Sequence, residues 1–527
     1  MSKPEKIIRD AVHGYIHIDA DYCEKIIDTP NFQRLKRLEQ TNTRPVYPCA
    51  HHDRFIHSLG TYHLGRTAFY SIRENSENEL KGKNLHLNWD SLKKSFELAC
   101  LLHDVGHAPF SHTFEKYYKL EGIGSNSTIQ EKLFDDNFIH SENNWGEKEL
   151  FKKEYKNYPL EVAKPHEIVS ALLVLTEYYE VLCNNFFVNP FLIARMILGL
   201  TYKEGEDITQ ERKFYNCFIE LLNGKTIDVD KLDYLTRDQW ATGHVSRVLD
   251  YERLFSSMYI KFESNNFYVC FHKRAINEIL SLNEIKKIIG VSMHSHPIVK
   301  YDEYVLRHAI EEIAYLIDNT ERQDKTVGKI ISYSTLKKDE FIEVGRFKFS
   351  LVTDDDLIYL LKRHIDESPY AKEWFYRDYK LKALWKTFAD YKYFFKDFFD
   401  EKDPDIEQQK QNEQQKRKLL STYRKTIVDK YFERIDPNKE KNYHYHVEDI
   451  LETEYELQIP DINIFIKDKI VKLNTLRDKY EKERESEKEQ QQKTYFLLYF
   501  PKDLLAKREE FIEFAKAEVE VLFKQNK

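Results

Sequence analysis

The chain has 527 residues, of which 41% are hydrophobic and 14% aromatic. That composition excludes a generally disordered protein, and the length favours two or three folded units that share a large core. The formal net charge of −8 argues against a surface dominated by non-specific binding to nucleic-acid phosphates. Because the chain has only 15 Gly and 14 Pro, we expect long helices joined by short loops rather than a β-sandwich or barrel.

The six cysteines lie far apart and form no CxxC pair, which argues against a disulfide framework or a zinc ribbon. The N-terminus (MSKPEKIIRD) carries charged residues within its first six positions and has no apolar region like that of a signal peptide, and the chain contains no run of about 18 apolar residues. We therefore expect a soluble, cytoplasmic protein with no membrane partner.

In chain order, apolar residues recur mostly at helical spacing between about residues 34 and 317. Residues 170–182 and 304–317 predict helices, whereas YIHI near the start and residues 267–271 predict short strands. Residues 351–364 predict a further helix, because Thr353 or Asp354 can cap its first turn. The expected fold class is mainly α.

The composition changes after this helix. Residues 401–417 and 481–493 are rich in Gln and charged residues, and predict linkers or solvated helices. Between and after them, IFIKDKIVKL and TYFLLYF predict strands, and LAKREEFIEFAKAEVEVLF predicts a helix. We therefore expect a helical unit at 1–330 and a smaller α+β unit at 331–527.

Histidines are concentrated in the segment LLHDVGHAPFSH, which directly follows a fully apolar run. If His103 and Asp104 lie on a helix, both side chains can reach one ion, and His107 lies one turn further on. Gly106 and Pro109 then end or kink that helix, which opens its end toward a cavity. Imidazole and carboxylate groups suit a divalent ion, but two adjacent ligands do not make a stable site.

Two other segments can supply the missing ligands, namely residues 51–65 (HHDRFIHSLGTYHLG) and 226–240 (TIDVDKLDYLTRDQW). The second sets four aspartates among apolar residues, and such groups are costly to bury unless they are paired or bind a metal. A lone His on an apolar helix face is usually an ordinary core residue. Three separate segments of this kind instead indicate a site.

The order RFIHSLG, LLHDVGHAPFSH and DVDKLDYLTRD resembles the HD-domain superfamily of metal-dependent phosphohydrolases, and within it the deoxynucleoside triphosphate triphosphohydrolases. The resemblance extends from KIIRDAVHGYIHI near the start, through IIDTPNFQRLKRLEQ, to about residue 310. It is nearest to members that also carry a sterile-alpha-motif domain, which we do not expect here because the HD core starts near residue 6. The resemblance implies that 1–330 is an HD-type phosphohydrolase domain.

The resemblance also implies roles for individual residues. Four metal ligands are implied: His57, His103, Asp104 and Asp230. Three catalytic residues are implied at the scissile phosphate and the leaving oxygen: His107, Glu115 and His166. Substrate contacts are implied to phosphates for Arg54, His112 and Lys231, to the sugar for Tyr234 and Asp238, and to the sugar or base for Gln40. The ion would be Mg, Mn, Fe, Ni or Zn, which His and Asp ligands do not distinguish.

The implied reaction is water attack at the α-phosphorus of a dNTP, which releases a deoxynucleoside and inorganic triphosphate. Three departures from the family pattern bear on it. Glu115 replaces an Asp, TNTRPVYP replaces a glycine-containing run, and Gly290, Lys300 and Tyr301 stand where the family has an Arg and a His-Lys pair.

Some family members are oligomers activated by a guanine nucleotide, and Lys6, Asp28 and Gln33 match activator-binding positions. Equally, this segment can simply start a helix that Asp28 or Thr29 caps. We expect a homo-oligomer that hydrolyses dNTPs. The alternatives are an HD phosphodiesterase or nuclease acting on nucleic acid or a cyclic nucleotide, and a nucleotide-sensing regulator with little turnover.

Overall fold

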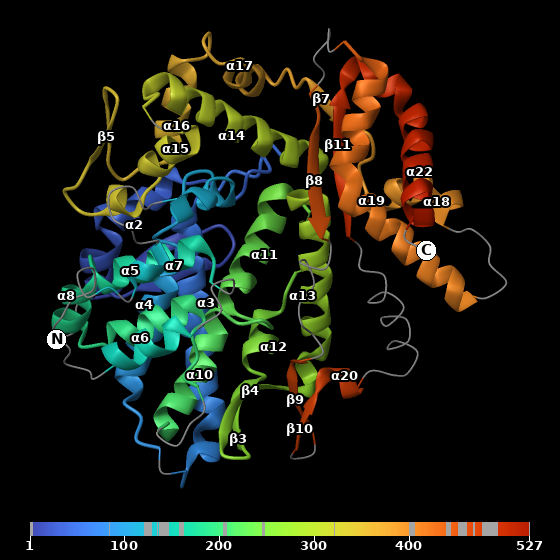
Figure 1. The fold of residues 1–527 in the computed structure, drawn as a ribbon. Helices are drawn as coiled ribbons and strands as arrows, with labels where there is room; N and C mark the ends of the chain where they lie inside the picture. Colours follow the sequence, from blue (N-terminus) through green and yellow to red (C-terminus); the bar gives the residue numbers. More distant parts are fainter. Residues whose placement is uncertain are drawn as a thin grey trace.

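The computed structural model describes residues 4–83, 85–120, 129–133, 135, 147–157, 163–203, 208–244, 248–320, 322–399, 406–438, 444–451, 461–466, 469–476 and 494–525. It confirms the mainly α fold, with small sheets at the periphery and toward the C-terminus (Figure 1). No helix among these residues is both long enough and apolar enough to cross a bilayer.

The first part of the chain folds into a bundle of helices. Its longer helices are α3 (Arg54–Leu80), α4 (Trp89–Leu102), α6 (Lys148–Lys156), α7 (Pro165–Leu175), α9 (Pro190–Leu198), α10 (Gln210–Leu222), α11 (Val229–Thr242) and α13 (Ile276–Ile289). Its short helices are α1 (Ala20–Tyr22), α2 (Pro30–Arg34), α5 (Ile129–Lys132), α8 (Tyr179–Val181) and α12 (Tyr251–Phe255). The predicted helix at 170–182 is thus divided, because α7 ends at Leu175 and α8 follows.

The second part adds the helices α14 (Pro297–Ile317), α15 (Gln323–Ile330), α16 (Asp354–Arg363), α17 (Pro369–Tyr376), α18 (Phe388–Phe399), α19 (Ile406–Ile435), α20 (Leu473–Leu476) and α22 (Arg508–Gln525). The α16 helix starts where the sequence predicts, and the Asp356 carboxylate accepts a hydrogen bond from the Thr353 backbone amide at 2.7 Å. The Gln-rich run from Ile406 onward is helical within α19, whereas residues 481–493 lie outside the described part of the chain.

Among the described residues, the strands form four small sheets. The hairpin β1 (Lys6–Asp10) and β2 (Gly14–Ile18) opens the chain, and β5 (Ile342–Val344) pairs with β6 (Phe347–Phe349). One sheet has the order β7 (Leu381–Ala383), β11 (Thr494–Pro501), β8 (His446–Leu451). The other joins distant parts of the chain in the order β10 (Lys469–Lys472), β9 (Asn463–Ile466), β4 (Asn266–His272), β3 (Met258–Glu263).

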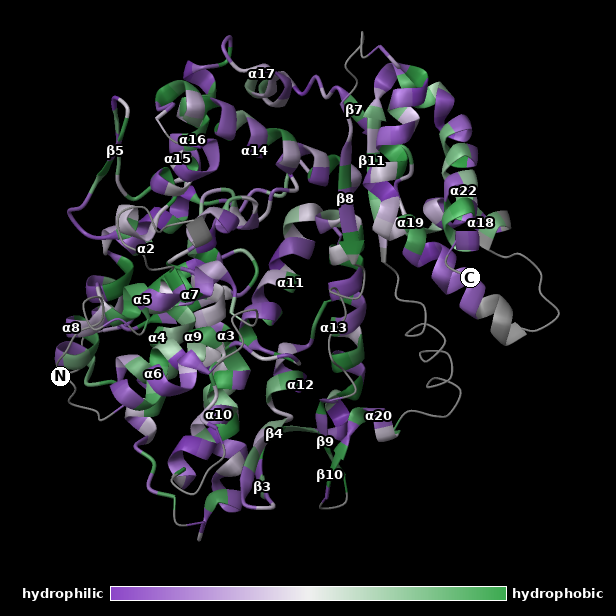
Figure 2. Ribbon diagram, viewed as in Figure 1, coloured by the Kyte–Doolittle hydropathy of each residue, from purple (hydrophilic) through white to green (hydrophobic). Residues whose placement is uncertain are grey.

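In the part of the chain that the structure describes, the buried apolar side chains gather in two clusters. The larger one includes α3, α4, α7 and α9, whose hydrophobic residues lie where these helices meet (Figure 2). The smaller one is built from the sheet β7-β11-β8 and the helices α18, α19 and α22. Residues 331–371 contribute to the larger cluster, as do Ile462 and Ile464 near β9. Residues on both sides of position 330 thus share the larger cluster, and β9 of the C-terminal part pairs with β4.

Close packing of α3 against α4 sets up the site. A Cβ atom at Gly65 of α3 would lie 2.6 Å from the Cys100 sulfur on α4, so only glycine lets the two helices approach this closely. The buried apolar residues before His103 hold the end of α4 in the core. That packing brings the first turns of α3 next to the C-terminal end of α4.

Candidate metal centre and active site

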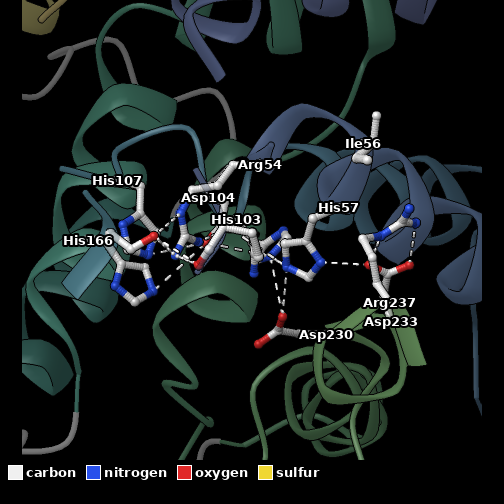
Figure 3. A network of polar contacts seen from close by, with 12 residues as sticks. Arg54, Ile56, His57, His103, Asp104, His107, His166, Asp230, Asp233 and Arg237 are labelled. Atoms are coloured by element: carbon white, nitrogen blue, oxygen red, sulfur yellow. Dashed lines mark hydrogen bonds and ion pairs between the residues drawn. The ribbon is translucent and has the colours of Figure 1, made fainter. Parts of the chain in front are cut away.

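Three buried or half-buried side chains from distant segments converge on one point (Figure 3). His57 lies in the first turns of α3, His103 directly follows α4, and Asp230 lies in the first turn of α11. The Nε2 atoms of His57 and His103 are 3.2 Å apart. The Asp230 Oδ1 atom lies 3.0 Å from the first and 3.6 Å from the second.

Asp104 adds a fourth side chain, and a second carboxylate, beside this group. Its Oδ1 atom is 3.6 Å from His103 Nε2, and its Oδ2 atom is 3.7 Å from His57 Nε2. Ligand bonds of about 2.0–2.2 Å place neighbouring ligand atoms about 3.0–3.6 Å apart, so the spacing suits one divalent ion. The expectation that His103 and Asp104 lie on a helix needs correction, since α4 ends at Leu102 and both residues stand in the turn that follows.

The electrostatics of this group favour a cation. Burial would lower the pKa of His57, but the Asp230 and Asp233 carboxylates raise it to about 10. Burial would raise the pKa of Asp104, yet the Arg54 guanidinium beside it holds that pKa below its ordinary value. A metal ion must therefore displace a proton from His57, which makes metal binding dependent on pH.

A second cluster of ionisable groups lies next to the first, around the Glu115 carboxylate. Glu115 Oε1 is 2.7 Å from His166 Nδ1 and 3.1 Å from the Nδ1 atoms of both His107 and His112. The rings of His107 and His166 stack with their centroids 4.1 Å apart. Burial opposes ionisation of Glu115, but the His166 and His112 imidazoles lower its pKa well below the ordinary value. Burial and the Arg54 charge lower the pKa of His107 well below its ordinary value, so His107 is neutral.

The loop that carries these residues has a strained backbone. Phe110 and Ser111 both have positive φ, at 50° and 53°, which non-glycine residues rarely adopt. The Asp354 carboxylate at the start of α16 accepts a hydrogen bond from the Phe110 amide at 2.6 Å. The Ser111 hydroxyl donates to the Glu39 carbonyl at 2.6 Å. The surrounding structure thus fixes the loop from both sides.

The implied substrate residues are only partly free to meet a substrate. Arg54 forms an ion pair with Asp104 and donates to Ser111 Oγ at 2.9 Å. Lys231 Nζ contacts the Asp228 carboxylate and donates to the Gly224 carbonyl at 2.7 Å, so it points away from the metal ligands.

The residues implied for the sugar or base lie on two segments. Tyr234 is half-buried on α11, and Asp238 on the same helix is buried, with Oδ1 3.0 Å from His52 Nε2. The Gln40 carbonyl accepts from Ser111 Oγ at 2.9 Å, while its side-chain oxygen is buried with no hydrogen-bond partner among the described residues.

Lys300 and Tyr301, which stand where the family has a His-Lys pair, contact nearby carboxylates, and the implied activator residues also contact other groups of the chain. Lys300 Nζ is 3.2 Å from Glu303 on α14, and the Tyr301 hydroxyl donates to Glu373 at 2.7 Å. At the implied activator site, the exposed side chains of Lys6 and Asp28 lie 3.7 Å apart. Gln33 donates to the Ile27 carbonyl at 2.7 Å, and α2 begins at Pro30.

Sequence reasoning assigned no role to several polar residues that contact the site. Asp233 lies 2.7 Å from His57, and it contacts His13 and Arg237 as well. Asp233 and Arg237 were visible as charges within an apolar segment, and His13 lies in the matched stretch KIIRDAVHGYIHI. Nothing in the sequence pattern indicates that His13 meets Asp233, because the two lie 220 residues apart.

Residues 54–172 match the HD domain. The fold and the site thus define a mainly α protein with an HD domain. The chain is 27% identical over 312 residues to a deoxynucleoside triphosphate triphosphohydrolase SAMHD1 homolog of Dictyostelium discoideum, covering 59% of this chain and 50% of that protein. Human deoxynucleoside triphosphate triphosphohydrolase SAMHD1 is 24% identical over 380 residues, covering 66% of this chain and 48% of that protein.

Some other similar proteins are named without an activity. An uncharacterized protein of Methanocaldococcus jannaschii is 27% identical over 308 residues, covering 58% of this chain and 49% of that protein. A hypothetical protein from Aquifex aeolicus has a similar fold, with a TM-score of 0.54, 19% identity, and coverage of 96% of this chain and all of that one. The chain spans about half the length of the curated relatives it matches.

Residues 54–172 are thus similar to the HD domain, and the chain is similar to proteins named as deoxynucleoside triphosphate triphosphohydrolases. The HD domain and these relatives support a phosphohydrolase, and the His and Asp cluster suits a divalent metal ion.

Proposed function

We propose that the protein hydrolyses deoxynucleoside triphosphates to deoxynucleosides and inorganic triphosphate. The observation that carries the proposal is the pair of adjacent clusters, one with metal-ligand spacing and one with a buried carboxylate against imidazoles. The relatives named as dNTP triphosphohydrolases support the choice of substrate.

The metal ion would be held by His57, His103, Asp104 and Asp230. When bound, it would offset the negative charge of the α-phosphate and draw electron density from the phosphorus. Arg54, at the edge of the same group, adds a fixed positive charge there. Because burial weakens competition from water, these charges act more strongly than they would on the surface.

The second cluster, around Glu115, would carry out the proton transfers. A water oxygen forms the new bond to the α-phosphorus, the bond from phosphorus to the 5′ oxygen breaks, and that oxygen needs a proton. His166 can supply it, because Glu115 holds its other ring nitrogen at 2.7 Å and stabilises the protonated ring. Neutral His107, stacked on His166, can accept a hydrogen bond from the attacking water.

We further propose that the enzyme is a homo-oligomer in the cytoplasm and that a guanine nucleotide activates it. The two exposed side chains of Lys6 and Asp28 support the activator site, because a carboxylate can accept two hydrogen bonds from a guanine edge and an ammonium can meet a phosphate. Substrate contacts are proposed for Gln40, Arg54, His112, Lys231, Tyr234 and Asp238. Lys231 must leave Asp228 to reach a phosphate.

The test is product analysis by chromatography after the protein is incubated with each dNTP, alone and in mixtures, with Mg²⁺ or Mn²⁺. We expect deoxynucleoside and triphosphate in equal amounts, and no turnover by a His103→Ala/Asp104→Ala variant. A His86→Ala/Asp90→Ala variant is the matched control, since it removes the same residue types from exposed positions. Faster hydrolysis in mixtures would support the activator.

Absence of nucleoside with every dNTP and mixture would contradict the proposal. Single-stranded nucleic acid and cyclic nucleotides would then be the next substrates to assay, as expected of an HD phosphodiesterase.

A further inference from the structure

One ring nitrogen of His57 faces away from the metal-ligand group and contacts a buried carboxylate. His57 Nδ1 lies 2.7 Å from Asp233 Oδ2, while Nε2 faces Asp230 and His103 (Figure 3). An ionised carboxylate only accepts hydrogen bonds, so the proton of neutral His57 sits on Nδ1. The lone pair of Nε2 is then free for a metal ion.

Asp233 is itself held on both of its oxygen atoms. Oδ1 lies 2.6 Å from His13 Nε2 and accepts from Arg237 Nη2 at 2.9 Å, while Oδ2 also accepts from Arg237 Nε at 2.9 Å. Arg237 in turn donates to Asp10 Oδ2 at 2.8 Å. The β1–β2 turn and α11 therefore fix the Asp233 carboxylate together.

The backbone of α3 is shaped to admit this carboxylate. A Cβ atom at Gly60 would lie 1.9 Å from Asp233 Oδ1 and 2.5 Å from Arg237 Nη2. No side chain fits in that space, so glycine at this position allows Asp233 to reach His57, one turn earlier on the same helix. The Asp10 and Asp233 carboxylates share the single guanidinium of Arg237. The remaining negative charge favours a cation on the Nε2 side of His57.

We infer that Asp233 is a positioning residue of the metal centre, which fixes the ring orientation and proton position of His57 so that Nε2 binds the ion. The inference rests on the metal site of the proposed function and not on its substrate. Outer carboxylates of this kind change metal affinity by about 10- to 100-fold when they are removed.

The test compares the Zn²⁺ affinity of three full-length proteins by competition with a chelator: the wild type, Asp233→Asn and Asp10→Asn. Both oxygens of Asp233 accept hydrogen bonds, from Arg237 on one side and from Arg237 and His57 on the other. In Asp233→Asn, the NH₂ group of the amide therefore faces an N–H donor in either orientation. Asp10→Asn is the matched control, since it loses the ion pair with Arg237 but does not touch His57.

We expect Zn²⁺ to bind about 10- to 100-fold more weakly to Asp233→Asn and within about threefold of wild type to Asp10→Asn, with thermal unfolding of both variants measured alongside. Wild-type affinity in Asp233→Asn, or an equal loss in both variants, would overturn the inference. If Asp233→Asn fails to fold, NMR of ¹⁵N-histidine-labelled wild type with Zn²⁺ decides: a protonated Nδ1 on His57 supports the inference, and a zinc-bound Nδ1 overturns it.

The outcomes separate this inference from the proposed substrate. Wild-type protein that binds no Zn²⁺ would overturn the metal site and the role of Asp233 together. Protein that binds Zn²⁺ with the expected difference between variants, but releases no nucleoside from any dNTP, would overturn the substrate alone.

Discussion

The Glu115 carboxylate gives the sharpest test of the proposed proton transfer. Glu115→Gln keeps the size of the side chain but removes the charge that faces His166 at 2.7 Å. A hydrogen bond to a charged group contributes about 1.5–3 kcal/mol, and here it would be made to the protonated ring in the transition state. At about 1.4 kcal/mol for each factor of ten, kcat should fall by about 10- to 150-fold.

The assay measures kcat and KM for nucleoside release at saturating metal, with the bound metal determined for each protein. Glu373→Gln is the matched control, because that buried carboxylate also accepts two hydrogen bonds, from the Tyr301 hydroxyl and the Lys380 amide, both at 2.7 Å. It should lose stability but keep kcat. A Glu115→Gln enzyme with kcat within twofold of wild type would refute the role of this carboxylate.

Three further predictions concern stability. Gly106→Ala should lower the free energy of unfolding by about 1–3 kcal/mol, because its Cβ would lie 2.4 Å from the Ser170 amide nitrogen; an unchanged urea midpoint would contradict this. Burial raises the pKa of Asp302 to about 6 from 3.8, although Tyr379 and Trp374 donate to it. Its stabilising contribution is therefore complete below about pH 4 and lost as the pH rises through about 6, by up to about 3 kcal/mol. Asp302→Asn should flatten that dependence in unfolding measured from pH 4 to 7, and an unaltered slope would disprove it. Dialysis against a chelator should lower the melting temperature, and restored metal should raise it again. At a metal concentration 100 times Kd, the bound ion should add about 3 kcal/mol to the free energy of unfolding. An unchanged melting temperature would argue against a metal site.

Local sequence patterns predicted much of the fold because they depend on neighbours in the chain. The helical spacing of apolar residues and the cap at Thr353 predicted helices that the structure contains, and the continuous apolar run TYFLLYF predicted β11. The divided helix after Leu175 was not predicted, since the apolar run continues past the point where the backbone turns.

By itself, the sequence determined the mainly α class, the HD motif and the kinds of side chain available for a metal site. Only the tertiary structure decided that His57, His103 and Asp230 meet, because contacts between segments 46 or more residues apart depend on how α3, α4 and α11 pack. The same holds for β9, which pairs with β4 from almost 200 residues away. A periodic pattern specifies an element and its buried face, whereas the partner of that face follows from the shape and charge of the whole core, as the contact between Gly60 and Asp233 illustrates.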